Sequence, residues 1–115
     1  MAVLDKAPVL DEETVGQLVA ELPCDVLMTI ISTFETDTAA IIEEMRAAGA
    51  CADQVAFARG AHKLAGTAAS FGARSLLDLA RHCERQAGEW VMLPVLQDQA
   101  RAASGAWRDR LAAAR

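Results

Sequence analysis

The sequence contains few of the residues that interrupt helices. Its 115 residues include only three prolines and seven glycines, whereas alanine, leucine and glutamate are abundant. Proline and glycine are the residues least compatible with a helix interior, and all-β domains with many short strands need them in their turns. The composition therefore predicts an all-α fold in which helices are joined by short turns.

Long apolar runs are also absent. No stretch approaches the roughly 20 consecutive apolar residues that a membrane-spanning helix needs. The first eight residues lack the basic region and apolar core of a secretory signal. We therefore expect no membrane contact and a cytoplasmic location. An initiating Met1 and the lack of a linker favour a domain that functions alone.

Cysteine is scarce, and its spacing matches no known framework. Cys24, Cys51 and Cys83 are odd in number, widely spaced and free of any C-x-x-C pair, which favours reduced, buried thiols over disulfides or a zinc site. His82, Cys83 and Glu84 are adjacent, so on a helix they would point in three directions, unlike the i, i+4 ligands of a helical metal site. We expect no metal site.

The charges are unevenly distributed along the chain. The net charge is −5, residues 1–54 hold 11 acidic and 2 basic side chains, and residues 55–115 hold 5 acidic and 9 basic ones. Because no run of Lys and Arg with interleaved aromatics occurs, we expect no nucleic-acid partner. Two interpretations of the asymmetry stay open: acidic helices pack beside basic ones, or the cations of the second half suit an anionic group and an acidic partner pocket.

Apolar residues recur at three- and four-residue steps in five segments. Asp11 is suited to cap the first helix, and Pro23 disfavours helical geometry in the residue before it. The expected helices span about 12–22, 23–49, 53–71, 73–87 and 94–111. The last four should be of comparable length and pack as an antiparallel up-down four-helix bundle, with the short extra N-terminal helix covering one end. We expect residues 1–9 to be a flexible lead-in and residues 10–115 to form a single domain.

His62 lies in the third expected helix, on the side opposite its apolar stripe. At about 100° per residue, the core face of this helix consists of Phe57, Gly60, Ala61, Leu64, Ala68 and Phe71. One turn before and after His62 lie Ala58, Ala65 and Gly66, so no bulky side chain covers the imidazole. Glycine inside a helix costs roughly 0.5–1 kcal/mol relative to alanine, and clearance beside His62 is one reason for Gly66.

The segment around His62 resembles a known motif. His62-x-Leu64-x-Gly66-Thr67, followed by Phe71-Gly72, resembles the H-x-L-K-G-S/T motif, with a following hydrophobic residue and glycine, of histidine-containing phosphotransfer (HPt) domains. Ala65 stands in place of the common lysine. The resemblance implies that His62 carries a phosphoryl group between aspartates of receiver domains in a multistep phosphorelay. The partners would be the receiver domains of a hybrid sensor histidine kinase and of a response regulator, and the chain would have no autokinase activity.

The resemblance also implies supporting residues. In the family a polar residue of the next helix holds the non-reacting ring nitrogen, and the matching position is Glu84, whose carboxylate would accept the Nδ1 proton and leave Nε2 for phosphorylation. The alternative for Glu84 is a solvated acid. Lys63 and Arg59, although not part of the family motif, would help to neutralise the phosphoryl oxygens and partly replace the lysine that is absent at Ala65, unless they are solvated side chains.

Small apolar residues surround His62 and would form a patch on which a partner helix could sit. The residues of this expected docking patch are Val55, Ala58, Ala65 and Ala69. Small residues also suit close packing inside a bundle, so the sequence leaves both interpretations open. No nucleotide-binding motif and no acidic cluster near His62 occur, so we expect no cofactor, with Mg²⁺ on the receiver partner only.

Two other functions remain as alternatives. One is a non-phosphorylated helical adaptor that binds receiver domains or another helical partner, for which Ala65 in place of lysine is the hint. The other is a small helical enzyme that uses His62 as a general base, which would require a substrate cleft that a filled four-helix core does not offer.

Overall fold

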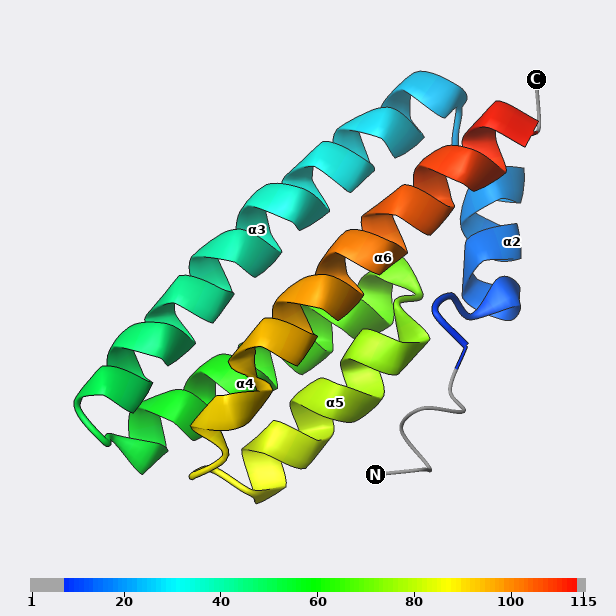
Figure 1. Ribbon diagram of the computed structural model, residues 1–115. Coiled ribbons are helices and arrows are strands. Elements are labelled where there is room, and N and C mark those ends of the chain that lie inside the picture. The colour runs from blue at the N-terminus through cyan, green and yellow to red at the C-terminus, as the bar shows by residue number, and fades with distance from the viewer. Residues whose placement is uncertain (1–7, 114–115) are drawn as a thin grey trace.

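The computed structural model describes residues 8–113, and within this range every regular element is a helix (Figure 1). The elements are α2 (Glu12–Glu21), α3 (Cys24–Ala50), α4 (Gln54–Phe71), α5 (Arg74–Arg85), the 3₁₀-helix η1 (Trp90–Met92) and α6 (Leu93–Ala113). The all-α class predicted from the composition is confirmed. None of these helices is both long enough and apolar enough to cross a membrane.

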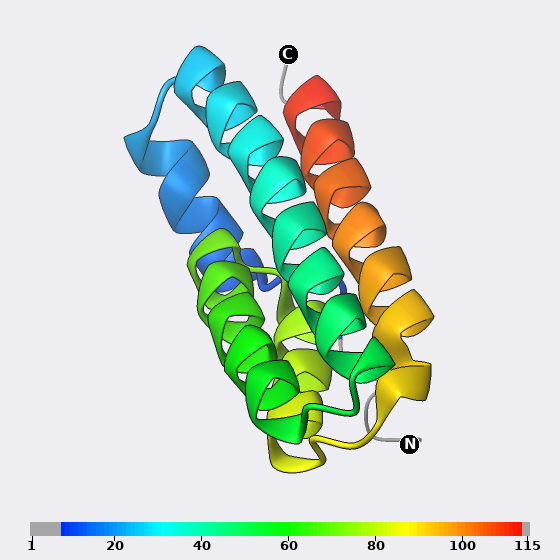
Figure 2. The ribbon, with the colours of Figure 1, turned by 90° about the vertical axis from the view of Figure 1, so that its left-hand side faces the viewer.

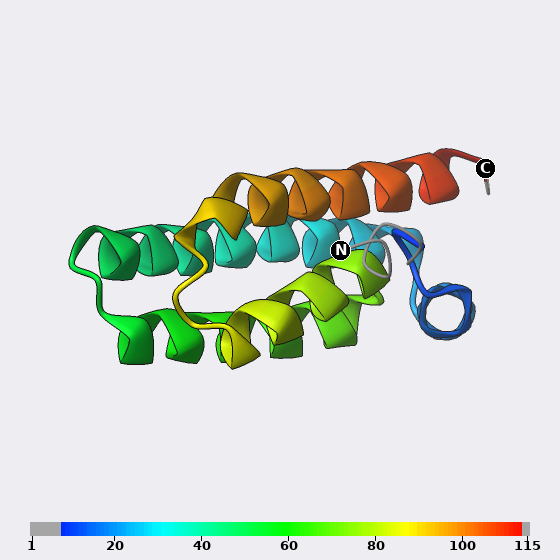
Figure 3. The same ribbon diagram turned by 60° about the horizontal axis from the view of Figure 1, so that its bottom comes forward.

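Helices α3 to α6 form the predicted antiparallel up-down bundle. Helix α3 packs against α4 and α6, and α5 packs against the same two helices. Figure 3 shows two layers, with α3 and α6 side by side in one and α4 and α5 in the other. The expectation of comparable lengths was wrong, because α3 has 27 residues and α6 has 21, whereas α4 has 18 and α5 only 12.

The extra N-terminal helix compensates for this difference in length. Helix α2 contacts α3 and α4 and lies at the end of the bundle where α3 and α6 extend beyond α4 and α5 (Figures 1 and 2). Its Val15 side chain is completely buried, and Arg110 of α6 forms an ion pair of 2.5 Å with Glu12. The prediction that a short first helix covers one end of the bundle is confirmed.

Hydrogen bonds tie the segment before α2 to the turn between α4 and α5. The Asp11 carboxylate caps α2 by accepting the Glu13 amide, as predicted. The Asp11 amide donates to the Gly72 carbonyl at 2.7 Å, and the Arg74 amide donates to the Val9 carbonyl at 3.0 Å. Val9, the last residue of the predicted lead-in, is thus bound to the bundle, and residues 1–7 of that lead-in lie outside the described residues.

Helix α5 ends at Arg85, two residues before the predicted end of the helix at 87. The chain then turns into η1, which the sequence analysis did not predict. The Trp90 ring of η1 packs edge-on against Phe57 with ring centroids 4.8 Å apart. It also lies against Gly49, where an added Cβ would come within 3.3 Å of the indole. The partly buried indole thus packs the segment that follows α5 against α3 and α4.

The core is continuous, and aromatic rings close its end near α2. Phe34 of α3 stacks on Phe71 of α4 with ring centroids 3.9 Å apart. Trp107 of α6 contacts Phe71 and donates its indole N–H to the Phe71 carbonyl at 2.8 Å. The last carbonyls of a helix have no partner within the helix. This bond therefore stabilises the end of α4, where Phe71 and Gly72 of the His62 motif lie.

Two of the three cysteines differ from the prediction of buried thiols. Cys24 and Cys51 are exposed and only Cys83 is buried. Cys24 begins α3 and Cys51 caps its end, so both lie at helix ends that no neighbouring helix covers. Burial, together with the negative charge of Glu89, raises the pKa of the Cys83 thiol to about 11.

Candidate functional site

His62 lies near the middle of α4 on its solvent-facing side. Its side chain is 76% exposed. Ala61, directly before it, and Leu64, two residues after it, are completely buried. An added Cβ at Gly66, one turn further along α4, would meet no atom within 4 Å. The space beside the imidazole is therefore open, as the small residues around it predicted.

Glu84 of α5 contacts the imidazole from the neighbouring helix. Its Oε2 atom lies 2.8 Å from Nδ1 of His62. Ala80, one turn before Glu84, is completely buried. Glu84 therefore lies on the face of α5 that is turned toward the bundle, at the border of that face with solvent. An ionised carboxylate only accepts hydrogen bonds, so the contact requires a proton on Nδ1. In the neutral ring the lone pair is then on Nε2, the atom that a partner can reach.

The two cations predicted near His62 have different surroundings. Lys63 Nζ lies 2.8 Å from Oε2 of Glu44 on α3, and both side chains are about half exposed. Arg59 is exposed and forms no ion pair within residues 8–113. Lys63 is therefore bound to an acid of the bundle, whereas Arg59 is available to an anion on the surface.

The expected docking patch is only partly present on the surface. Val55 is 69% exposed, Ala69 is exposed and Ala58 is half-buried. Ala65 requires a correction, because it is only 7% exposed and belongs to the core. A residue three positions after His62 is rotated by about 60° around the helix, which is enough to carry Ala65 from the solvent face into the bundle. The surface thus retains Val55 and Ala58 before His62 and Ala69 after it, and because a helix rises about 1.5 Å per residue, Val55 and Ala69 lie about 21 Å apart and form no single patch.

His82 has a separate environment. Its Nε2 atom lies 3.3 Å from Oε2 of Glu89, in the segment between α5 and η1, and its side chain is largely buried. Among residues 8–113, no group of three or more His, Cys, Asp and Glu side chains is arranged to hold a metal ion. His62 is thus the more exposed of the two histidines.

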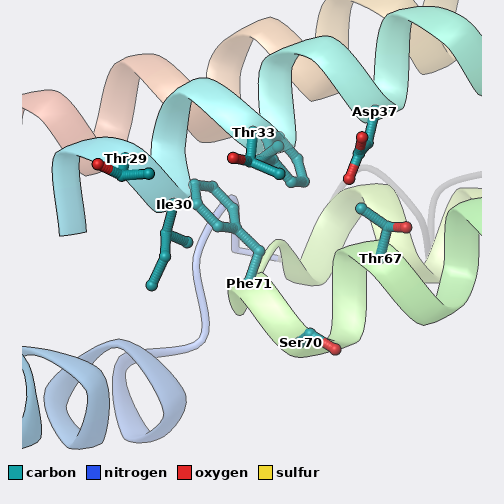
Figure 4. Close-up of a pocket in the computed structure, with 8 residues that line it drawn as sticks. Thr29, Ile30, Thr33, Asp37, Thr67, Ser70 and Phe71 are labelled. Atoms are coloured by element: carbon teal, nitrogen blue, oxygen red, sulfur yellow. The ribbon is translucent and has the colours of Figure 1, made fainter. Parts of the chain in front are cut away.

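A groove between α3 and α4 was missed by the sequence analysis. One pocket of about 340 Å³ (Figure 4) is lined by Thr29, Ile30, Thr33, Phe34, Asp37, Thr67, Ser70 and Phe71. A second, of about 500 Å³, shares Asp37, Thr67 and Ser70 with it and extends to Lys63 and Gly66. The spacing of Thr29, Thr33 and Asp37 at i, i+4 and i+8 on α3 could have indicated a polar stripe here. The groove therefore ends beside the residues that flank His62.

Most of the chain matches one known protein family. The family model described as Hpt domain matches residues 29–115, which include α4, α5 and the whole His62 motif. The chain belongs to the HPt family. Comparisons with curated proteins and with solved structures found no match. HPt domains take part in phosphorelays, where they interact with receiver domains, and membership confirms the resemblance that the His62 motif indicated. Helix α2 lies outside the matched residues.

Proposed function

We propose that this HPt protein relays a phosphoryl group between receiver-domain aspartates, with His62 as the transient carrier. One receiver would belong to a hybrid sensor histidine kinase and the other to a response regulator. The observation that carries the proposal is the exposed imidazole whose Nδ1 lies 2.8 Å from Glu84, inside the region that matches the family. Phosphoryl transfer depends mainly on positioning and electrostatics, and this contact positions the ring.

The proposed step conserves atoms and charge. The Nε2 lone pair of His62 attacks the phosphorus of an aspartyl phosphate on the donor, the P–O bond to the aspartate breaks, and the carboxylate leaves. The proton on Nδ1 stays in its hydrogen bond to Glu84. In the second step an aspartate of the other receiver attacks the same phosphorus, and the P–N bond breaks. Mg²⁺ would be held by the receiver, so the chain itself would act as a carrier without autokinase activity.

The surface around His62 supports docking of a receiver on this side of the bundle. Val55 and Ala58 before His62 and Ala69 after it are apolar residues at the surface of α4, and the groove between α3 and α4 reaches Gly66. Apolar residues surrounded by polar ones are common in transient protein interfaces. The receiver would therefore contact both sides of His62 at once.

The test is incubation with receiver domains that have been phosphorylated beforehand. The wild-type chain should acquire an acid-labile phosphoryl group, His62→Gln should acquire none, and His82→Gln should be labelled like the wild type. Since His62 lies outside the core, its substitution should leave helix content and the melting temperature nearly unchanged. Full labelling of His62→Gln would disprove the site. Tight receiver binding without any labelling of the wild type would instead support the adaptor.

A further inference from the structure

A phosphoryl group on Nε2 of His62 would lie on the side of the imidazole opposite Glu84, whose carboxylate contacts Nδ1 at 2.8 Å. Because the proton stays on Nδ1, the phosphorylated ring is formally positive, and this charge faces the Glu84 carboxylate. The phosphoryl oxygens carry the negative charge beyond Nε2, where charge-assisted hydrogen bonds are the strongest contacts available to them. A cation on the outer side of the ring would therefore stabilise the phosphoryl oxygens.

The helix geometry of α4 favours Arg59 for this task. Residues three and four apart lie on the same face of a helix, whereas neighbours in the chain are rotated by about 100°. Arg59 is three residues before His62, and Lys63 directly follows it. Helical side chains also lean toward the N-terminus, so the imidazole extends over the turn that contains Arg59. The next turn offers no competing cation, since Ala65 and Gly66 occupy it.

The ion pairs point to the same residue. Lys63 is bound to Glu44 at 2.8 Å across α3 and α4, whereas Arg59 is exposed and forms no ion pair within the described part of the chain. The guanidinium also has a planar set of donors that can hold two phosphoryl oxygens at once. Arg81 and Arg85 on α5 are exposed as well, but they flank Glu84 on its own helix, on the Nδ1 side of the ring.

We propose that Arg59 binds the phosphoryl oxygens on His62 during transfer. This inference rests on the proposed function of His62. It assigns the electrostatic role to a residue one turn before the histidine. The rotation of about 100° between neighbouring residues, and to a smaller extent the exposed Lys63–Glu44 ion pair, explain why Lys63 does not fill that role.

The test is the rate of transfer from a phosphorylated receiver to variants of the full chain, measured over a range of receiver concentrations. Loss of a charge-assisted contact to the transferring group should slow the maximal rate of Arg59→Gln roughly tenfold. The half-saturating receiver concentration should stay unchanged. Arg59→Lys should retain most of the rate, and Arg81→Gln should stay within about twofold of the wild type. Because Lys63 lines the groove proposed for receiver docking, Lys63→Gln is expected to raise the half-saturating receiver concentration, but it should lose less of the maximal rate than Arg59→Gln.

A double variant tests the role of Glu44. Glu44→Gln releases Lys63, so adding it to Arg59→Gln should restore part of the lost rate, whereas Glu44→Gln alone should not slow transfer. The proposal is overturned if Arg59→Gln transfers at the wild-type rate or changes only the half-saturating concentration, or if Lys63→Gln or Arg81→Gln loses as much of the maximal rate. Absence of labelling on the wild type would instead show that the proposed function has failed.

Discussion

Glu84 and His62, 22 residues apart in the chain, meet through a 2.8 Å contact between Oε2 and Nδ1. The contact joins α4 to α5 at the outer edge of their interface, where the Glu84 side chain is 39% exposed. A pair that is this accessible to water contributes little to stability. Its main effect is therefore on the orientation and tautomer of the imidazole.

Glu84→Ala should leave the imidazole without an acceptor at Nδ1. We expect a mixture of the two ring tautomers, phosphorylation at both nitrogens, and transfer slowed by about tenfold or more, in line with losses of residues that orient functional histidines. Glu84→Gln should keep the Nδ1–H tautomer, because its amide oxygen still accepts the hydrogen bond. NMR of the ring nitrogens distinguishes these cases. Asp78→Ala, on the same helix, is the control, and an unchanged tautomer in Glu84→Ala would contradict the role of Glu84.

Gly66→Leu should slow phosphotransfer severely while the domain stays folded. Leucine is the better helix former by about 0.8 kcal/mol, and a Cβ at Gly66 meets no atom within 4 Å, but the longer side chain would block the approach of a partner to His62. Gly105 on α6 is a matched control, since its Cβ would also meet nothing within 4 Å. The measurement is the transfer rate and the urea unfolding of Gly66→Leu and Gly105→Leu. Equal transfer rates for the two variants would show that clearance at Gly66 is unimportant.

Alanine at two glycines of α4 should change stability in opposite directions. At Gly60 an added Cβ would come within 2.5 Å of Met45 Cγ, so the buried Met45 side chain would have to change its rotamer or α3 and α4 would have to move apart. We expect Gly60→Ala to destabilise the fold by about 1–3 kcal/mol, the usual cost of overpacking a core. Gly66→Ala should stabilise it by about 0.5–1 kcal/mol through helix propensity. Chemical denaturation followed by circular dichroism measures both, and a stabilised Gly60→Ala would contradict the tight packing.

Cys83 should make the fold less stable at alkaline pH. Its pKa is raised from 9.0 to about 11 by burial and by Glu89, so the folded state favours the neutral thiol. The free energy of unfolding is unaffected by the ionisation of this thiol below pH 9. It falls as the pH rises from about 9 toward 11, because in this range the unfolded chain loses the Cys83 proton while the folded chain keeps it. Comparison of the denaturation of Cys83→Ala with the wild type at pH 8 and pH 10.5 tests this, and the wild type should lose more stability than the variant.

The exposure of the three cysteines predicts how quickly their thiols react. The exposed Cys24 and Cys51 should react quickly with an alkylating reagent at pH 8, whereas Cys83 should react only after unfolding. Mass spectrometry after a short exposure counts the modified thiols. Rapid alkylation of Cys83 in the folded chain would contradict its burial.

Most of the fold follows from local patterns in the sequence. The first and third helices begin after Asp11 and Asp53, whose carboxylates cap them, and the third ends at Gly72 with the left-handed backbone, φ 76°, that glycine favours. Contacts within a few residues decide these features, so a single sequence carries them. The contact of Glu84 with His62 was inferred from the family resemblance instead, since it depends on the register of two helices.

The features that were missed depend on distant parts of the chain. The segment after α5 packs through Trp90, whose indole contacts Phe57 and lies against Gly49, far away in the sequence. Ala65 is buried because of the way α4 is rotated against its neighbours, and the Lys63–Glu44 ion pair depends on how far α3 is shifted along α4. Helical periodicity predicts which face a residue occupies only to within about one position. The burial of Ala65 and the Lys63–Glu44 contact depend on smaller differences in the rotation and shift of the helices.

The indole of Trp107 also bears on the order in which the bundle is completed during synthesis. The carbonyl that ends α4 obtains its donor from a residue 36 positions later, in α6. Until that tryptophan leaves the ribosome, the end of α4 lacks both this hydrogen bond and the ring packed against Phe71. The helix that carries His62 is thus completed only after α6 has been made, and a nascent chain presents the histidine on a supported surface only once α6 has left the ribosome.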